Sequence, residues 1–306
     1  MDFGGYFRER GLYRSSIAVK LYRALRVVAA RLGLQVVLKT FYSPIPELDR
    51  LPPGTFERVS DLPGIDLRLE DQLAFLEQRL AEPMREFRPP PRATGDPHRY
   101  AVENPSYSHM DAAVLFAMVR ALRPSRIVEL GSGQSTLVIA EALRRGAPGT
   151  RFEVYDPYAA VITDDVRGVS AVHRLPAQAI GWETFQALGA GDILFVDTTH
   201  TVKVGSDVNF IVLEVLPRLA PGVVVHLHDI FLPFEYPRVW LEDYGLYWAE
   251  QYLVQALLAM NPGFEILIAD AALTALRGDD VTARLPPGIP PGGSAFWIRR
   301  TAFEHA

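Results

Sequence analysis

From Arg126 onward, short apolar runs alternate with longer segments in which apolar residues recur at helical spacing. Such alternation is typical of βαβ units, which place parallel strands in one sheet and cover both faces of the sheet with helices. The pattern therefore predicts an α/β fold built on a seven-stranded, mostly parallel sheet. The expected strands are Arg126–Leu130, Arg151–Tyr155, Ala171–Arg174, Asp192–Val196, Val223–Leu227, Phe264–Ile268 and Ala295–Arg299.

The beginning of the chain follows a different pattern. From Ser15 to about Leu38, apolar residues at helical spacing are interrupted by one lysine and three arginines, which predicts a basic amphipathic helix. Such a helix can contact a membrane surface. The favoured interpretation is that it packs on its own domain or on a second copy of the chain, so a homo-oligomer is an expectation.

Prolines then mark a boundary. Four prolines between Pro44 and Pro53 break regular structure, and a helical stretch from Leu69 to Glu86 ends before the triple proline Pro89–Pro91. A further helix is expected over Met110–Leu122. We therefore expect a mainly helical N-terminal extension over residues 1–100 and a second domain over residues 101–306.

Composition narrows the class of function. A chain of 306 residues with 49% hydrophobic residues can bury a full-sized core, and a net charge of -5 gives no basic footprint for nucleic acid. A small-molecule substrate fits better. The absence of cysteine excludes disulfides, thiolate metal ligands and cysteine nucleophiles. The charged N-terminus and the lack of a long apolar run suggest a cytoplasmic protein.

A glycine turn follows the first predicted strand, in RIVELGSGQSTLVIAEAL. Gly131 and Gly133 allow a tight bend and a close approach of the backbone to a ligand, at the start of a helix with free N–H groups. Asp156 ends the next strand, where it can accept hydrogen bonds from ribose hydroxyls. A dinucleotide and S-adenosylmethionine both remain candidates, although Thr136 replaces the third glycine of the dinucleotide motif.

Polar residues also follow two later strands. Asp197, His200 and Lys203 come after the fourth predicted strand, and His228 and Asp229 come after the fifth. If these strands are neighbours, the side chains converge and can hold a divalent cation such as Mg²⁺, which activates an acceptor hydroxyl. Without a metal, His200 can act as a general base.

Two nearby residues have plainer interpretations. His226 is more simply a core histidine than a metal ligand, and Asp207 can cap the helix expected over Val208–Leu219.

Together these residues resemble a known family. Glu129-x-Gly131-x-Gly133 resembles the first motif of class I S-adenosylmethionine-dependent methyltransferases, which have a Rossmann-like sheet. The branch of small-molecule O-methyltransferases, such as those acting on macrolide sugars, is the most similar. Longer segments are similar to a bacterial subgroup: FYSPIPE (Phe41–Glu47), DTTHTVKVGSDVNF (Asp197–Phe210) and HLHDIFLPFEYP (His226–Pro237).

The resemblance implies roles for particular residues. In the metal-dependent branch, one Asp after the fourth strand and an acidic pair after the fifth hold magnesium; here His228 stands where the family often has an acid. The implied metal ligands are Asp197, His228 and Asp229, and the implied catalytic residues are His200, Asp197 and Lys203. The implied S-adenosylmethionine-binding residues are Glu129, Gly131, Ser132, Gly133, Ser135, Asp156 and Asp197.

The resemblance also implies an activity, namely methylation of an oxygen on a small polar acceptor of glycosyl or natural-product type. Three alternatives stay open: N-methylation, a metal-dependent hydrolase or lyase on a similar sheet, and a binding subunit without activity. The aromatic-rich segment 230–253 is expected either to close over the substrate or to pack as a helix on the sheet.

Overall fold

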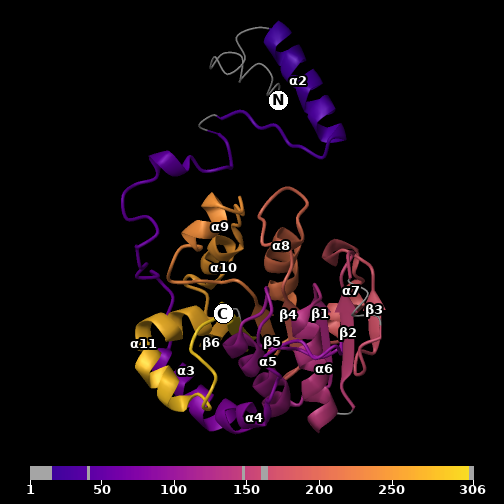
Figure 1. Cartoon of the computed structure of the whole chain (residues 1–306), viewed down its shortest axis with the longest axis vertical. Coiled ribbons are helices and arrows are strands. Elements are labelled where there is room, and N and C mark those ends of the chain that lie inside the picture. Colours follow the sequence, from indigo (N-terminus) through magenta and orange to yellow (C-terminus); the bar gives the residue numbers. More distant parts are fainter. Residues whose placement is uncertain (1–15, 40–41, 147–148, 160–164, 303–306) are drawn as a thin grey trace. The chain divides into compact units, whose positions relative to one another are not determined.

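A single sheet organises the larger part of the molecule. The computed structural model describes residues 16–39, 42–146, 149–159 and 165–302, and its seven strands follow the order β3-β2-β1-β4-β5-β7-β6 (Figure 1). Strands β1 to β5 are parallel, and β7 runs antiparallel to both β5 and β6. The strands are β1 (Arg126–Leu130), β2 (Arg151–Tyr155), β3 (Ala171–His173), β4 (Ile193–Val196), β5 (Val224–Leu227), β6 (Phe264–Ala269) and β7 (Phe296–Arg300).

This topology confirms the predicted Rossmann-like, mostly parallel sheet with helices on both faces. Each predicted strand is present, and its ends lie within one residue of the prediction. The helices are α2 (Ser16–Arg31), α3 (Leu69–Phe75), α4 (Ala81–Glu86), α5 (His109–Leu122), α6 (Gln134–Gly146), α7 (Trp182–Gln186), α8 (Asp207–Phe210), α9 (Arg238–Glu242), α10 (Glu250–Leu258) and α11 (Asp270–Arg284), with shorter turns η1 (Leu48–Arg50), η2 (Leu76–Leu80), η4 (Ala177–Ala179), η5 (Ile211–Val215) and η6 (Leu216–Arg218).

The core forms two layers because side chains alternate along each strand. Ile127 of β1 belongs to a cluster with α5 and α6. The next residue, Val128, belongs to a second cluster with η5 and α10 on the other face. Burial on both faces explains why the strands are nearly continuous apolar runs rather than alternating ones.

The chain divides into two compact units, Met1–Leu51 and Pro52–Ala306. In the first, α2 ends at Arg31 because Gly33 adopts a left-handed φ of 73°. The Gly33 and Leu34 N–H groups then donate to the carbonyls of Ala30 and Ala29, which closes the helix end. The predicted helix over Ser15–Leu38 is therefore shorter, and Ser15 lies outside the described residues.

Residues 52–100 pack with the second unit, since α3 contacts both β6 and α11. The boundary expected near residue 100 thus falls inside that unit. Helices are found where the sequence predicts them over Leu69–Glu86 and Met110–Leu122, and Ser108 caps α5 by accepting a hydrogen bond from the Asp111 N–H.

Candidate functional site

A pocket of about 390 Å³ opens at the carboxyl ends of β1, β2 and β4, the usual place for a ligand on an open parallel sheet. Its volume lies in the range typical of small-molecule sites. Of the residues that the sequence predicts for cofactor binding or catalysis, the pocket is lined by Gly131, Ser132, Asp156, Asp197 and Lys203. The other four, Glu129, Gly133, Ser135 and His200, are not among its lining residues.

The glycine turn serves packing as well as ligand access. Gly131 has a φ of 89°, and a Cβ placed there would lie 1.8 Å from the Asp197 carbonyl oxygen. Any side chain at this position would therefore push β1 away from the end of β4. At Gly133, by contrast, an added Cβ would meet no atom within 4 Å, so the backbone there faces open space.

Asp156 is held in place at the end of β2. Its carboxylate accepts hydrogen bonds from the Ser132 hydroxyl and from the Tyr158 N–H. Each carboxylate oxygen can accept more than one bond, so the group still has capacity for ligand hydroxyls. The arrangement is what the sequence predicts for a ribose-binding acid.

Glu129 has a different environment. Its side chain is fully buried, and its two oxygens accept hydrogen bonds from the Ser135 hydroxyl (2.7 Å) and the Thr136 hydroxyl (2.8 Å). Burial raises the pKa of Glu129 to about 8, despite those two hydrogen bonds. Glu129 thus ties β1 to the start of α6, behind the pocket surface.

A second group of ionisable residues adjoins the pocket at Asp197. Ligand atoms of Asp197, His200 and Asp229 all lie within 4.8 Å of one another. The His200 Nε2 atom is 3.2 Å from Asp197 Oδ1 and 3.7 Å from Asp229 Oδ2. His200 and Asp229 both have left-handed φ angles, 52° and 56°, a costly backbone state that tends to cluster at functional sites.

Glu250, which the sequence analysis missed, completes this group. Its buried carboxylate lies at the start of α10, and its Oε2 is 2.8 Å from His200 Nδ1. The Ala249 and Glu250 N–H groups donate to the His200 carbonyl, and the Trp248 ring lies 4.2 Å from the imidazole. The only sequence signal was an acid inside an aromatic-rich segment. We call Asp197, His200, Asp229 and Glu250 the His200 cluster.

Electrostatics within the His200 cluster favour a charged imidazole. Burial alone would lower the pKa of His200, but hydrogen bonds and charges from Asp197 and Glu250 outweigh it and raise that pKa to about 10. Burial also works against ionisation of Asp197, yet the nearby His228 and His200 lower its pKa to about 2. For Asp229 and Glu250, burial dominates and raises the pKa. A histidine protonated on both nitrogens cannot accept a proton, so this geometry does not favour His200 as a general base.

His228 and His226 lie to one side of the cluster. The His228 ring stacks on Tyr107, with centroids 4.8 Å apart, and its Nε2 is 3.8 Å from Asp229 Oδ1. His226 stacks on Phe195 at 4.1 Å, fully buried, and neither of its ring nitrogens has a hydrogen-bond partner among the described residues. His226 is thus a core histidine, and the imidazole that converges with the two aspartates is His200 rather than His228.

The loop after β4 forms one wall of the pocket. Asp207 accepts hydrogen bonds from the Thr199 hydroxyl (2.6 Å) and N–H (3.2 Å). The cap of α8 is Ser206, which accepts from the Asn209 N–H, so the prediction that Asp207 caps this helix is wrong. Lys203 is exposed on the same wall.

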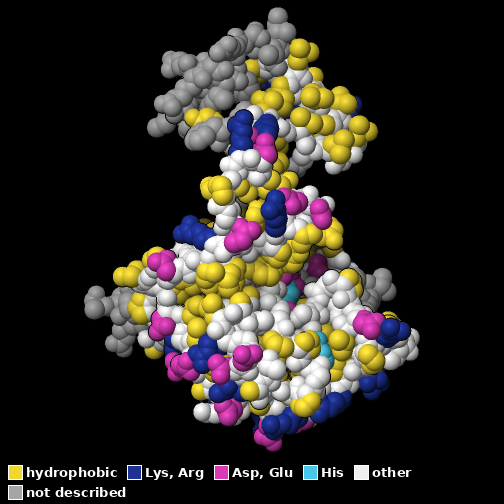
Figure 2. All heavy atoms as spheres, turned by 60° about the vertical axis from the view of Figure 1, so that its left-hand side comes forward, with side chains coloured by type: hydrophobic (Ala, Val, Ile, Leu, Met, Phe, Trp, Pro, Cys, Tyr) yellow, Lys and Arg dark blue, Asp and Glu magenta, His cyan; other side chains and the backbone are white. Residues whose placement is uncertain are grey.

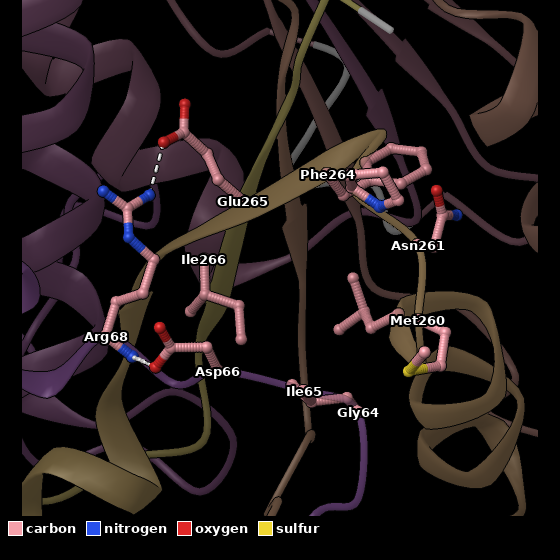
Figure 3. Close-up of a pocket in the computed structure, with 11 residues that line it drawn as sticks. Gly64, Ile65, Asp66, Arg68, Met260, Asn261, Phe264, Glu265 and Ile266 are labelled. Carbon is pink, nitrogen blue, oxygen red and sulfur yellow. Dashed lines mark hydrogen bonds and ion pairs between the residues drawn. The ribbon is translucent and has the colours of Figure 1, made fainter. Parts of the chain in front are cut away.

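Another cavity, of about 300 Å³, lies at the edge strand β6 (Figure 3). Its charged lining groups are engaged with one another: Arg68 bonds to Glu265 through its side chain and to Asp66 through its backbone N–H. No sequence-predicted site residue lines this cavity.

Comparisons with known proteins point to the region of the first pocket. Residues 128–230, about one third of the chain, match the family described as "Methyltransferase domain". A search of curated proteins found no match.

Three similar solved structures illustrate the likeness to known folds. The O-methyltransferase TomG from Streptomyces achromogenes, involved in tomaymycin synthesis and in complex with S-adenosylmethionine (SAM), is 16% identical over 76% of this chain and 90% of that chain, with a TM-score of 0.39. The Podospora anserina methyltransferase PaMTH1, bound to S-adenosylhomocysteine (SAH), is 16% identical over 88% and 100%, with a TM-score of 0.40. An O-methyltransferase from Bacillus cereus in complex with SAH is 13% identical over 76% and 90%, with a TM-score of 0.38. The family match itself extends from β1 to the residue after Asp229, which is the part of the chain that carries the pocket and most of the His200 cluster.

Proposed function

We propose that this chain is a SAM-dependent methyltransferase whose cofactor occupies the pocket at the ends of β1, β2 and β4. The observation that carries the proposal is the pocket of about 390 Å³ lined by Gly131, Ser132 and Asp156, within the residues that match a methyltransferase domain. Asp156 would accept hydrogen bonds from the ribose hydroxyls, and the open backbone around Gly133 would admit the methionine end.

Methyl transfer requires that the acceptor oxygen be aligned with the cofactor's methyl group and that the acceptor lose one proton. The cofactor supplies a methyl group on a sulfonium, which an acceptor oxygen takes by in-line displacement while its own proton leaves. Asp197 lines the pocket and also belongs to the His200 cluster. An acceptor hydroxyl beside Asp197 and Asp229 would therefore lie at the border between the cofactor and the buried charges.

The donor set of the His200 cluster fits a divalent cation. Two carboxylates and one imidazole suit Mg²⁺ or Mn²⁺. The hydrogen bond between His200 Nδ1 and Glu250 leaves Nε2 directed at Asp197 and Asp229, and a cation bound there would take the place of the Nε2 proton. An imidazole oriented by a carboxylate is a recurring feature of metal sites. We propose Asp197, His200 and Asp229 as the ligands, with Glu250 orienting His200; a bound cation would lower the pKa of the acceptor hydroxyl.

The acceptor we propose is a small polar molecule of glycosyl or natural-product type. Aromatic rings next to His200 support this class: Trp248 packs on the imidazole, and Trp240 packs on Trp248 with centroids 5.0 Å apart. Such rings can cover the apolar face of a sugar or polyketide while the carboxylates hold its hydroxyls.

Calorimetry with SAM and SAH tests the cofactor proposal. We expect saturable binding, and Asp156→Asn should weaken it by roughly 10- to 100-fold, since hydrogen bonds to charged groups contribute about 1.5–3 kcal/mol. The exposed Asp279→Asn is the matched control. No binding at millimolar cofactor would contradict the proposal, and metal binding without cofactor binding would favour a metal-dependent hydrolase or lyase.

Calorimetric titration of the EDTA-treated protein with Mn²⁺ tests the metal proposal separately. Saturable binding that His200→Asn abolishes and His228→Asn retains would support the ligand set. Loss of binding in His228→Asn with retention in His200→Asn would instead support the ligands implied by the sequence resemblance.

A further inference from the structure

An apolar stripe runs along α2, and no described residue of the N-terminal unit covers it. Leu21, Leu25, Val28 and Leu32 recur at intervals of three or four residues, so they share one side of the helix. They are 67%, 53%, 56% and 72% exposed. Ten of the 22 exposed large hydrophobic side chains in the described part of the chain lie between Leu21 and Ile45. Figure 2 shows a dense cluster of hydrophobic side chains on this unit.

The side of α2 that carries Tyr22 and Ala29, roughly a quarter turn from the stripe, has a local partner. The segment after the helix returns along it, and the Tyr22 hydroxyl donates to the Val36 carbonyl at 3.2 Å. Ala29 is buried, and its carbonyl accepts from the Leu34 N–H. The helix therefore has a local partner on one side, and the leucine stripe is left outside this small unit.

Positive charge accompanies the stripe. Between Arg10 and Pro46 the sequence holds seven Lys and Arg residues and no Asp or Glu, although the whole chain has a net charge of -5. On the helix, Lys20 and Arg31 flank the stripe and Arg23 lies opposite; all three are exposed. An apolar stripe flanked by cations matches the two layers of an anionic lipid surface, with acyl chains below and phosphates above.

The length of α2 decides how it would engage a membrane. Sixteen residues extend about 24 Å as a helix, less than the hydrocarbon thickness of a bilayer. No helix in the described ranges is long and apolar enough to cross a membrane. Pairing α2 with a second copy of itself would bring two sets of basic residues together without any acid on either helix to compensate them.

We propose that α2 lies in the interface of an anionic lipid membrane, with Leu21, Leu25, Val28 and Leu32 in the acyl region and its basic residues among the headgroup phosphates. None of these residues lines the pocket or belongs to the His200 cluster. It would bring the methyl-transfer site to acceptors that are made or held at a lipid surface.

Cosedimentation of the full chain with lipid vesicles tests the proposal. The chain should bind vesicles of phosphatidylcholine with phosphatidylglycerol, bind poorly to phosphatidylcholine alone, and dissociate as salt is raised. Lys20→Gln with Arg31→Gln should reduce partitioning by roughly 25-fold, because each basic residue near an anionic surface contributes a factor of about five. Leu21→Ser with Leu25→Ser should abolish binding.

Matched controls keep the test independent of folding and of the proposed activity. Arg58→Gln with Arg85→Gln removes two exposed charges outside this unit, and Leu213→Ser with Leu276→Ser removes two exposed leucines; both double variants should bind vesicles like the wild type. All variants should keep wild-type circular dichroism and cofactor affinity. Failure of the wild type to bind anionic vesicles would overturn the proposal. So would self-association that the leucine variant abolishes in the absence of lipid binding, since the stripe would then be a contact between copies.

Discussion

The pocket at the ends of β1, β2 and β4 and the His200 cluster share Asp197 but are built in different ways. The pocket is formed by strand ends and the turns that follow them, and the carboxylate of the partly exposed Asp156 accepts hydrogen bonds from Ser132 and Tyr158. The His200 cluster joins side chains from the loops after β4 and β5 and from the start of α10, and His200 and Glu250 are almost fully buried.

Because of this difference, substitutions in the two regions should affect ligand affinity and the stability of the fold in different ways. A solvated carboxylate such as Asp156 can be replaced at little cost to the fold, because water solvates whatever remains. A buried charge depends on its partners, and removing one partner leaves the others uncompensated. Ligand affinity and stability should therefore be independent in the pocket and coupled in the His200 cluster.

The largest effect is expected for His200→Ala. Without the imidazolium, the carboxylates of Asp197 and the buried Glu250 would both lose the group that hydrogen-bonds them, so the free energy of unfolding should fall by about 3–5 kcal/mol. Urea unfolding followed by circular dichroism measures this change. The half-buried His98→Ala is the control and should change stability little, since no side-chain partner of His98 is recorded among the described residues. If His200→Ala unfolded at the same urea concentration as the wild type, the fold would not depend on the charge of His200, which would contradict the expected difference between the two regions.

The same contrast explains what sequence reasoning could reach. Hydrophobic periodicity is local, so the sequence predicts all seven strands to within one residue. Ser132, Asp156 and Asp197 follow strand ends, and all three line the pocket; their role in binding a cofactor stays a prediction. Glu250 was missed because it lies 50 residues after His200 and meets it only through tertiary packing. Phe41, in one of the family-like segments, lies outside the described residues.

The direction in which a side chain points is a second feature that the sequence does not predict. The sequence resemblance assigns His228 to the metal and His200 to catalysis, but the His228 ring stacks on Tyr107, while the His200 ring, on a residue with left-handed backbone angles, lies between Asp197 and Asp229. A residue-level choice between two histidines depends on such backbone angles, and no periodicity encodes them.

A smaller effect is expected for Glu250→Gln. The amide can still accept a hydrogen bond from His200 Nδ1, so the fold should survive, but the imidazole loses the charge that orients and polarises it. Affinity for Mn²⁺ should fall by roughly 10- to 100-fold, as measured by calorimetric titration, with cofactor affinity unchanged. Glu242→Gln, at an exposed ion pair on α9, is the control. Equal Mn²⁺ affinity in wild type and Glu250→Gln would show that Glu250 has no orienting role.

Near pH 5 the smallest effect is expected for Glu129→Gln, because a protonated Glu129 and a glutamine are both neutral there; the pH dependence of this variant tests whether burial raises the pKa of Glu129. Glu129 lies on the strand that leads into the pocket, but burial raises its pKa from 4.5 to about 8. Its stabilising contribution should be fully present below about pH 4.5 and be lost as the pH rises through 8, because unfolding then releases a proton that the native state retains. The Gln variant cannot ionise, so its free energy of unfolding should decline less than that of the wild type between pH 5 and pH 8. The difference between the two proteins should therefore shift in favour of the variant over that interval.

Urea titrations at several pH values measure this shift, with the exposed Glu57→Gln as the control for loss of a charge. A constant difference across the interval would mean that Glu129 ionises at the same pH in the native and unfolded states, despite its burial.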